Sequence, residues 1–312
     1  MPRSKQSIPV PVVTDHYVNI YKPQEDVFTL PTVTVRGRGQ CRFTYEQGGA
    51  YLDWRTNDHT FIKDHKNRWH CFGITKPWMS GDNTHAGEGL CFHALAPETP
   101  NGPFAESVQI QSWQDRPKIV DGGVGWAPTS IKIGSQYNLI GSGLDRMVSE
   151  DLENWTYAGK LDVPIGGVGG DVRDPQISII DGVYHMVICC CDKIGLSTSK
   201  DFVNWTDMTV IFKPEDDAWR TESPFLVAYD GRYYLFWSLW DRGDLTTSGY
   251  TTKSFVQCSE SLLDFNGDPV AEFSAHAPNV IQDDAGAWFI SSTDYPHRGI
   301  SVAPFEWKTD CV

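Results

Sequence analysis

The chain has 312 residues, of which 40 are acidic and 26 are basic, giving a net charge of −14. That charge argues against nucleic acid and anionic membrane as partners, because both need a basic surface. No apolar run approaches the length of a transmembrane helix. The N-terminus MPRSKQSIPVPVV also lacks the apolar core of a signal peptide, so we expect a cytoplasmic protein, or a secreted one if a signal was removed.

The first 45 residues differ in character from the rest of the chain. They are rich in proline and polar residues and contain one apolar stretch, VTVRG. We predict an N-terminal extension or a closing segment over 1–45, followed by one domain over 46–312.

From residue 57 onward, one pattern recurs five times. A polar or aromatic opening leads into a proline (a histidine in the first copy), a short apolar strand, a turn and an aromatic-rich second strand. The aromatic residue follows the proline position by 9 or 10 residues. The proline positions are His59, Pro128, Pro175, Pro224 and Pro278. The spacing of these positions, together with the short strands, is typical of four-stranded propeller blades.

A second repeated element supports this interpretation. The segments SEDLENW (149–155) and SKDFVNW (199–205) share Ser-x-Asp-apolar-x-Asn-Trp and lie 50 residues apart. Each is predicted to belong to the outer hairpin of a blade. Together with 28 glycines, 19 prolines and 12% aromatic residues, the pattern predicts an all-β fold. We expect a five-bladed β-propeller with four-stranded antiparallel blades around a central channel.

The five openings should point at one another, because the first strand of each propeller blade lines the channel. Three carboxylates from three blades would then share one pocket, and their repulsion should raise the pKa of at least one. A protonated acid beside an ionised carboxylate is what cleavage of a glycosidic bond requires. The openings contain Asn57-Asp58, Trp126, Arg173-Asp174, Glu222 and His276.

The remaining candidates are residues that could bind a sugar. Arg173 could bind hydroxyl groups with its guanidinium, or it could serve only as an ion-pair partner of Asp174. Asn57 and His276 are placed in the same pocket. The aromatic faces of Trp54, Trp126 and Trp219 could form its walls, although each tryptophan could equally belong to the blade core.

These openings resemble those of the five-bladed propeller glycosidases of glycoside hydrolase family 43, with features of families 32, 68 and 62. The matching residues are, in blade order, Asp58, Trp126-Ala127-Pro128, Asp174-Pro175, Glu222-Ser223-Pro224 and His276. The resemblance covers residues 54–307 and rests on the ordered set, since no single motif is specific. It implies Asp58 as general base, Glu222 as general acid, and Asp174 as the residue that tunes the acid and orients the sugar.

Two departures from family 43 concern the mechanism. Asn57-Asp58-His59 replaces the usual Asp-Pro, and WRTNDHTF (54–61) is similar to the Trp-x-Asn-Asp-Pro of family 32. Arg173-Asp174-Pro175 also resembles family 32, in which the counterpart of Asp58 is a nucleophile and configuration is retained. Family 43 implies that Asp58 activates water and the anomer inverts. We expect inversion, because Trp-Ala-Pro and Glu-Ser-Pro-Phe-Leu follow family 43.

The expected function is therefore hydrolysis of arabinofuranosyl, xylosyl or fructofuranosyl linkages in an oligosaccharide or small glycoside. The alternatives are a retaining fructofuranosidase or a glycosyl-transferring enzyme, a non-catalytic sugar-binding propeller, and a propeller that catalyses another reaction. No cofactor is required and no protein ligand set for a metal is assigned. The channel could hold Ca²⁺ or another ion, which His276 would contact through solvent.

Overall fold

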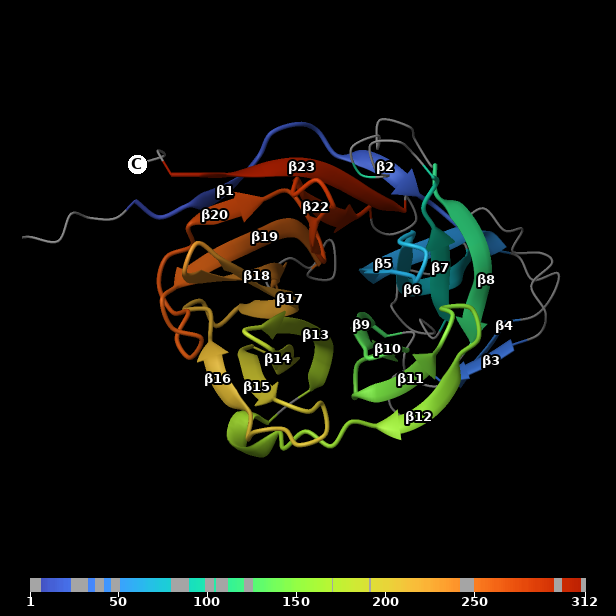
Figure 1. The fold of residues 1–312 in the computed structure, drawn as a ribbon, viewed down its shortest axis with the longest axis horizontal. Coiled ribbons are helices and arrows are strands. Elements are labelled where there is room, and N and C mark those ends of the chain that lie inside the picture. Colours follow the sequence, from blue (N-terminus) through green and yellow to red (C-terminus); the bar gives the residue numbers. More distant parts are fainter. Residues whose placement is uncertain are drawn as a thin grey trace, which may run out of the picture.

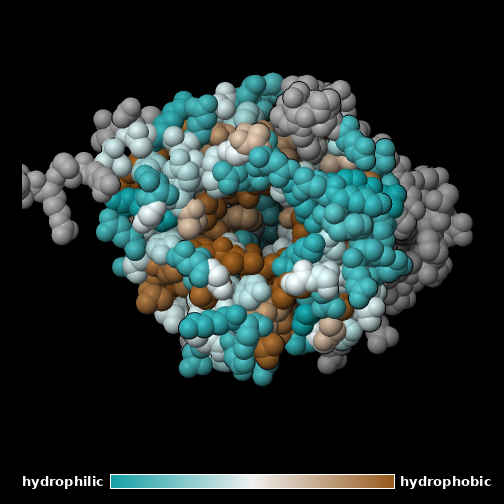
Figure 2. Space-filling view, in the orientation of Figure 1, coloured by the Kyte–Doolittle hydropathy of each residue, from teal (hydrophilic) through white to brown (hydrophobic). Residues whose placement is uncertain are grey.

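The computed structural model describes residues 7–23, 33–36, 42–45, 51–79, 90–98, 104, 112–120, 126–169, 171–190, 192–241, 250–294 and 299–309. Five antiparallel sheets stand in a ring around a central axis (Figure 1). The predicted five-bladed β-propeller is confirmed. The space-filling view shows a hollow at the centre of the ring, with hydrophobic residues along part of its rim (Figure 2).

Each of the first four blades is built from four consecutive strands, with the first strand innermost. Blade one comprises β5 (Tyr51–Lys63), β6 (Trp69–Met79), β7 (Leu90–Leu95) and β8 (Gln114–Val120). Blade two comprises β9 (Thr129–Ile133), β10 (Gln136–Ile140), β11 (Asp145–Ser149) and β12 (Thr156–Lys160). Blade three comprises β13 (Val172–Ile180), β14 (Val183–Cys190), β15 (Ile194–Ser199) and β16 (Thr209–Phe212). Blade four comprises β17 (Trp219–Tyr229), β18 (Arg232–Asp241), β19 (Tyr250–Ser259) and β20 (Ala271–Phe273).

The fifth blade joins the two ends of the described chain. Its strands are β21 (Val280–Gln282), β22 (Trp288–Thr293), β23 (Ile300–Lys308) and, outermost, β1 (Val10–Val13). β2 (Val18–Tyr21) also pairs with β23, so both strands from the N-terminal segment add to the last blade (Figure 1). Outside the ring sheets, β3 (Val33–Arg36) pairs with β4 (Arg42–Tyr45), and a short 3₁₀ helix, η2, spans Gly166–Val168.

The hydrophobic core lies between the blades. Over the described residues, buried apolar side chains form five clusters, one at each joint between neighbouring blades. β14 shows why such a strand is apolar throughout, since successive side chains of a strand point to opposite faces. Met186, Ile188 and Cys190 pack toward blade two, whereas Val187 and Cys189 pack toward blade four. Both faces are covered, which explains the consecutive apolar residues MVICC.

The repeated Ser-x-Asp-apolar-x-Asn-Trp element forms the same turn twice, between the third and fourth strands of blades two and three. Asp151 Oδ1 accepts backbone N–H groups from Glu153 at 2.9 Å and Asn154 at 2.8 Å. Asp201 Oδ1 accepts the two equivalent N–H groups at the same distances. The prediction that these segments lie in outer hairpins is confirmed. In the described part of the chain, no helix is long and apolar enough to span a membrane.

Candidate active site

The inner strands of blades one, three and four are irregular at the predicted site. Pairing with the second strand shifts register between Thr56 and His59, between Arg173 and Gln176, and between Glu222 and Phe225. Such bulges commonly redirect side chains near functional sites. In blades two to five, the residue before the proline has a positive φ, with Ala127 at +42°, Asp174 at +55°, Ser223 at +46° and Ala277 at +50°. Asp58, which precedes His59 rather than a proline, is not among them.

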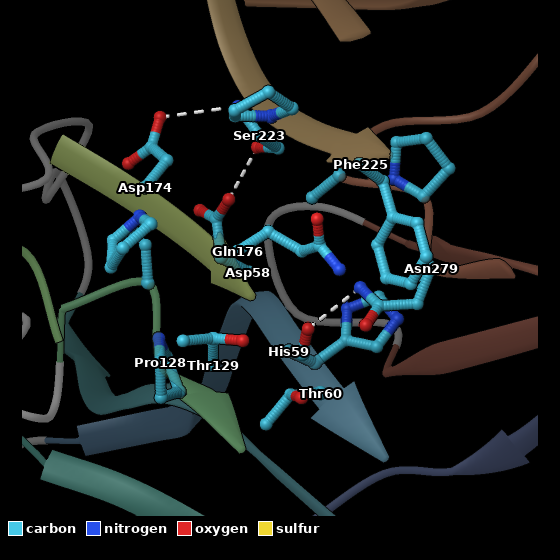
Figure 3. Close-up of a pocket in the computed structure, with 15 residues that line it drawn as sticks. Asp58, His59, Thr60, Pro128, Thr129, Asp174, Gln176, Ser223, Phe225 and Asn279 are labelled. Atoms are coloured by element: carbon cyan, nitrogen blue, oxygen red, sulfur yellow. Dashed lines mark hydrogen bonds between the residues drawn. The ribbon is translucent and has the colours of Figure 1, made fainter. Parts of the chain in front are cut away.

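The candidate residues occupy two successive positions of the repeat. Asp58, Asp174 and Ser223 directly precede the proline position and, with Ala127 and Ala277, line a narrow cavity on the propeller axis (Figure 3). Glu222 stands one position earlier, where the neighbouring blade has Arg173. The cavity has a volume of about 30 Å³, which is room for a single water molecule. Asp58 and Asp174 therefore face the axis, whereas Glu222 does not line this cavity and is joined to Asp174 through Arg173.

Arg173 joins two of the carboxylates. Its Nη1 donates to Asp174 Oδ2 at 2.8 Å and to Glu222 Oε1 at 2.7 Å, while Nη2 donates to the Thr221 carbonyl oxygen at 3.0 Å. Burial alone would lower the pKa of Arg173, but Asp174 and Glu222 raise this pKa above its ordinary value. The guanidinium therefore stays charged, and one cation is shared between two acids.

Ser223 joins the third carboxylate to this group. Its hydroxyl donates to Asp58 Oδ1, and its backbone N–H donates to Asp174 Oδ2 at 3.2 Å (Figure 3). One residue thus connects blades one, three and four. Ser223 was not among the predicted site residues, although its position matches those of Asp58 and Asp174 in the repeat.

His276 lies beside Glu222 at the opening of the fifth blade. Its Nε2 is 3.7 Å from Glu222 Oε2, and its side chain is almost fully buried. Its Nδ1 is 2.8 Å from the Thr251 carbonyl oxygen. Because a carbonyl can only accept, this ring nitrogen carries the proton.

His59, in the same region, makes structural hydrogen bonds. Its Nε2 lies 2.7 Å from Ser291 Oγ in the fifth blade, and its carbonyl accepts from Asn279 Nδ2 at 2.7 Å. Burial lowers the pKa of His59 to about 3. The ring is therefore neutral near pH 7 and serves to connect the first blade to the fifth.

The tryptophans predicted to bind sugar differ in their exposure. Trp54 is only 2% exposed, so the structure does not support it as a wall of an open subsite. Trp219 is half-buried and stacks on Phe255 in the blade core, with ring centroids 5.5 Å apart. Trp126 remains partly exposed at the opening of blade two. Trp240, which sequence reasoning missed, has its ring 5.7 Å from the Arg173 guanidinium carbon.

Asn57 and a channel ion were also predicted from the sequence. Asn57 is buried in the blade-one opening, and its Oδ1 has no hydrogen-bond partner among the described residues. Within the same part of the chain, no group of three or more His, Cys, Asp or Glu side chains is arranged to hold a metal ion. A Ca²⁺ or other ion held through solvent stays a prediction.

The fold and this site define a class: a five-bladed propeller with two aspartates at its axis and a glutamate joined to one of them through an arginine. Solved glycoside hydrolases share the fold. An endo-arabinase from Bacteroides thetaiotaomicron aligns with a TM-score of 0.55 at 17% identity, covering 81% of this chain and 95% of that one. A family 43 enzyme from Xanthomonas citri, solved with xylose, aligns with a TM-score of 0.56 at 11% identity, covering 83% and 90%.

A family 32 β-fructofuranosidase from Bombyx mori aligns equally well, with a TM-score of 0.57 at 16% identity over 83% of this chain and 62% of that one. The expected structural resemblance to families 43 and 32 is confirmed at the level of the fold. No protein-family model matches the chain, and no curated protein matches it by sequence.

Proposed function

We propose that the protein is a glycoside hydrolase that cleaves arabinofuranosyl, xylosyl or fructofuranosyl linkages. The observation that carries this proposal is the connection of Asp58, Asp174 and Glu222, from three blades, through hydrogen bonds of Ser223 and Arg173. The fold shared with an endo-arabinase, a xylose-bound family 43 enzyme and a β-fructofuranosidase supports this substrate class.

We assign the role of general acid to Glu222. Its side chain is 18% exposed, against 9% for Asp174, so a glycosidic oxygen can reach it more readily. Glu222 shares its contact with Arg173 Nη1, and that nitrogen also donates to Asp174. When Glu222 turns toward a leaving group, Arg173 therefore keeps an anionic partner.

Asp174 is suited to orientation rather than proton transfer. Its Oδ2 accepts both the Arg173 guanidinium and the Ser223 backbone N–H, so the carboxylate is held in one position. Its own backbone N–H donates to Ser142 Oγ at 3.0 Å, which fixes the main chain at this positive-φ residue. A carboxylate held in this way can bind sugar hydroxyl groups and shape the field around Glu222.

Asp58 would act on the opposite side of the anomeric carbon. In the inverting reaction, Glu222 protonates the glycosidic oxygen as the bond to the anomeric carbon breaks. Asp58 accepts a proton from a water molecule as that water attacks the same carbon. In the retaining alternative, Asp58 itself attacks the carbon, and water later hydrolyses the ester while Glu222 acts as base.

The experiment is a hydrolysis screen of aryl α-L-arabinofuranosides, aryl β-D-xylosides and sucrose with the wild-type protein and Asp58→Asn. We expect turnover of at least one substrate and a loss of about 10²- to 10⁴-fold in the variant, the usual contribution of acid–base groups. Glu306→Gln, which neutralises an exposed carboxylate in the fifth blade, is the control. Sugar binding without turnover by the wild-type protein would instead establish the non-catalytic alternative.

A further inference from the structure

Ser223 occupies a backbone conformation that glycine adopts most easily. Its φ is +46°, within the region that non-glycine residues populate only rarely because the Cβ atom crowds the backbone. The same position in blades two and five is taken by Ala127 and Ala277, which carry no polar group. A serine in this place therefore calls for a reason beyond the shape of the bulge.

The hydroxyl of Ser223 provides that reason. It donates to Asp58 Oδ1 across the channel, in a contact between residues 165 positions apart. The backbone N–H of the same residue donates separately to Asp174 Oδ2 at 3.2 Å. Ser223 therefore contacts two of the three carboxylates, and the third belongs to the preceding residue, Glu222.

We propose that Ser223 is a positioning residue that holds Asp58 in its reactive orientation. The inference rests on the proposed glycosidase function and adds to it a residue outside the carboxylate set. By donating to one oxygen, the hydroxyl fixes the rotation of the carboxyl group and favours its ionised form. A misplacement of about 1 Å at a reacting group can cost about 10²-fold in rate.

Other charged or titratable groups set the background for any pH effect. His59 from blade one and Asp174 from blade three line the same cavity. Arg173 contacts Asp174 and Glu222, and His276 from the fifth blade lies beside Glu222. All of them remain when only the Ser223 hydroxyl is removed. A change confined to the acidic limb of the activity profile would therefore report on Asp58 and its hydroxyl partner.

The test compares Ser223→Gly and Ser223→Ala with Ala277→Gly. Both serine variants keep the N–H that holds Asp174, and Ser223→Gly also relieves the positive φ. Ala277→Gly measures what relief of φ does by itself at an equivalent position. We expect both serine variants to lose about 10- to 10²-fold in kcat. KM should stay within about 3-fold, and the acidic limb of kcat/KM should move to higher pH, because the ionised form of Asp58 has lost a donor. The Tm of Ser223→Gly should not fall.

The proposal is overturned if Ser223→Gly loses no more kcat than Ala277→Gly, or if the acidic limb stays in place. A second readout separates this failure from failure of the proposed function. The ¹³C chemical shift of the Asp58 carboxyl group, followed against pH, should titrate at higher pH in Ser223→Gly than in the wild type. An identical titration in both proteins would refute the role of the hydroxyl, whether or not the wild type hydrolyses a glycoside.

Discussion

Arg173 donates to Glu222 across the joint between the third and fourth blades, with Nη1 and Oε1 2.7 Å apart. The two residues stand at the same repeat position in neighbouring blades, one position before the bulged residues that line the axis. A cation thus lies directly beside the proposed acid. The sharing of this cation with Asp174 makes it the electrostatic centre of the site.

Replacing Arg173 should affect both activity and stability. Lysine keeps the charge but has no planar fork, so Arg173→Lys cannot reach two carboxylates and the Thr221 carbonyl together. We expect a loss of about 10²-fold in kcat/KM from the resulting misplacement. Arg173→Met removes the cation between Asp174 and Glu222 and should lower the free energy of unfolding by about 3–5 kcal/mol. Urea unfolding checks this value, and Lys308→Met, which replaces an exposed lysine, is the control. Wild-type stability of Arg173→Met would show that the pair is not structural.

Glu222→Gln should separate substrates by their leaving groups. A dinitrophenyl glycoside departs without protonation, so the variant should hydrolyse it at close to the wild-type rate of bond cleavage. Alkyl glycosides need the proton, and their kcat should fall by about 10²- to 10⁴-fold. A plot of log kcat against leaving-group pKa measures the difference as a steeper slope for the variant. Equal losses on all substrates would remove Glu222 from the role of acid.

The anomer released first should have the inverted configuration. In that case Asp58 activates water and forms no covalent bond to the sugar, so a 2-fluoro glycoside should leave no adduct on the protein. ¹H NMR during the first minutes of hydrolysis identifies the anomer before mutarotation, and mass spectrometry of the intact protein detects an adduct. Retention of configuration, together with a sugar bound to Asp58, would instead establish the family 32-like mechanism.

Stability should fall as the pH decreases from about 6.5, because buried histidines resist protonation, and His59 and His93 show the largest effects. Burial lowers the pKa of His59 to about 3, and burial lowers that of His93 to about 2. The unfolded chain binds protons at these positions below about pH 6.5, whereas the folded protein does not. Each histidine should therefore contribute a slope of up to about 1.4 kcal/mol per pH unit.

Urea unfolding of His93→Gln between pH 6.5 and pH 4.5 measures this contribution. We expect a shallower decline than in the wild type. Burial raises the pKa of Asp64, but backbone and side-chain donors including Arg68 outweigh burial and lower this pKa to about 2. The contribution of Asp64 to the pH dependence is therefore confined to pH values below about 4, so it does not interfere in this range. Parallel pH dependences for the two proteins would contradict the prediction.

The sequence alone determined the ring and pointed to Asp58 and Asp174, which line the cavity on its axis. A propeller blade is a local unit of consecutive hairpins, so its turns and alternating strands recur at a readable spacing. The duplicated Asp151 and Asp201 turns are examples, since every partner lies within a few residues. Even the opening of each inner strand could be placed, because a proline or His59 marks it.

Only the tertiary structure decided which groups touch. The bulges in β13 and β17 turn Asp174 and Ser223 toward the axis, and the closed ring brings Ser223 to Asp58 from 165 residues away. Tertiary packing buries Trp54, which the sequence could not distinguish from an exposed aromatic residue. These contacts depend on where neighbouring blades lie and on the local twist of each strand. A linear pattern records the side chain at each position, but the direction of that side chain is set by the sheets that pack around it.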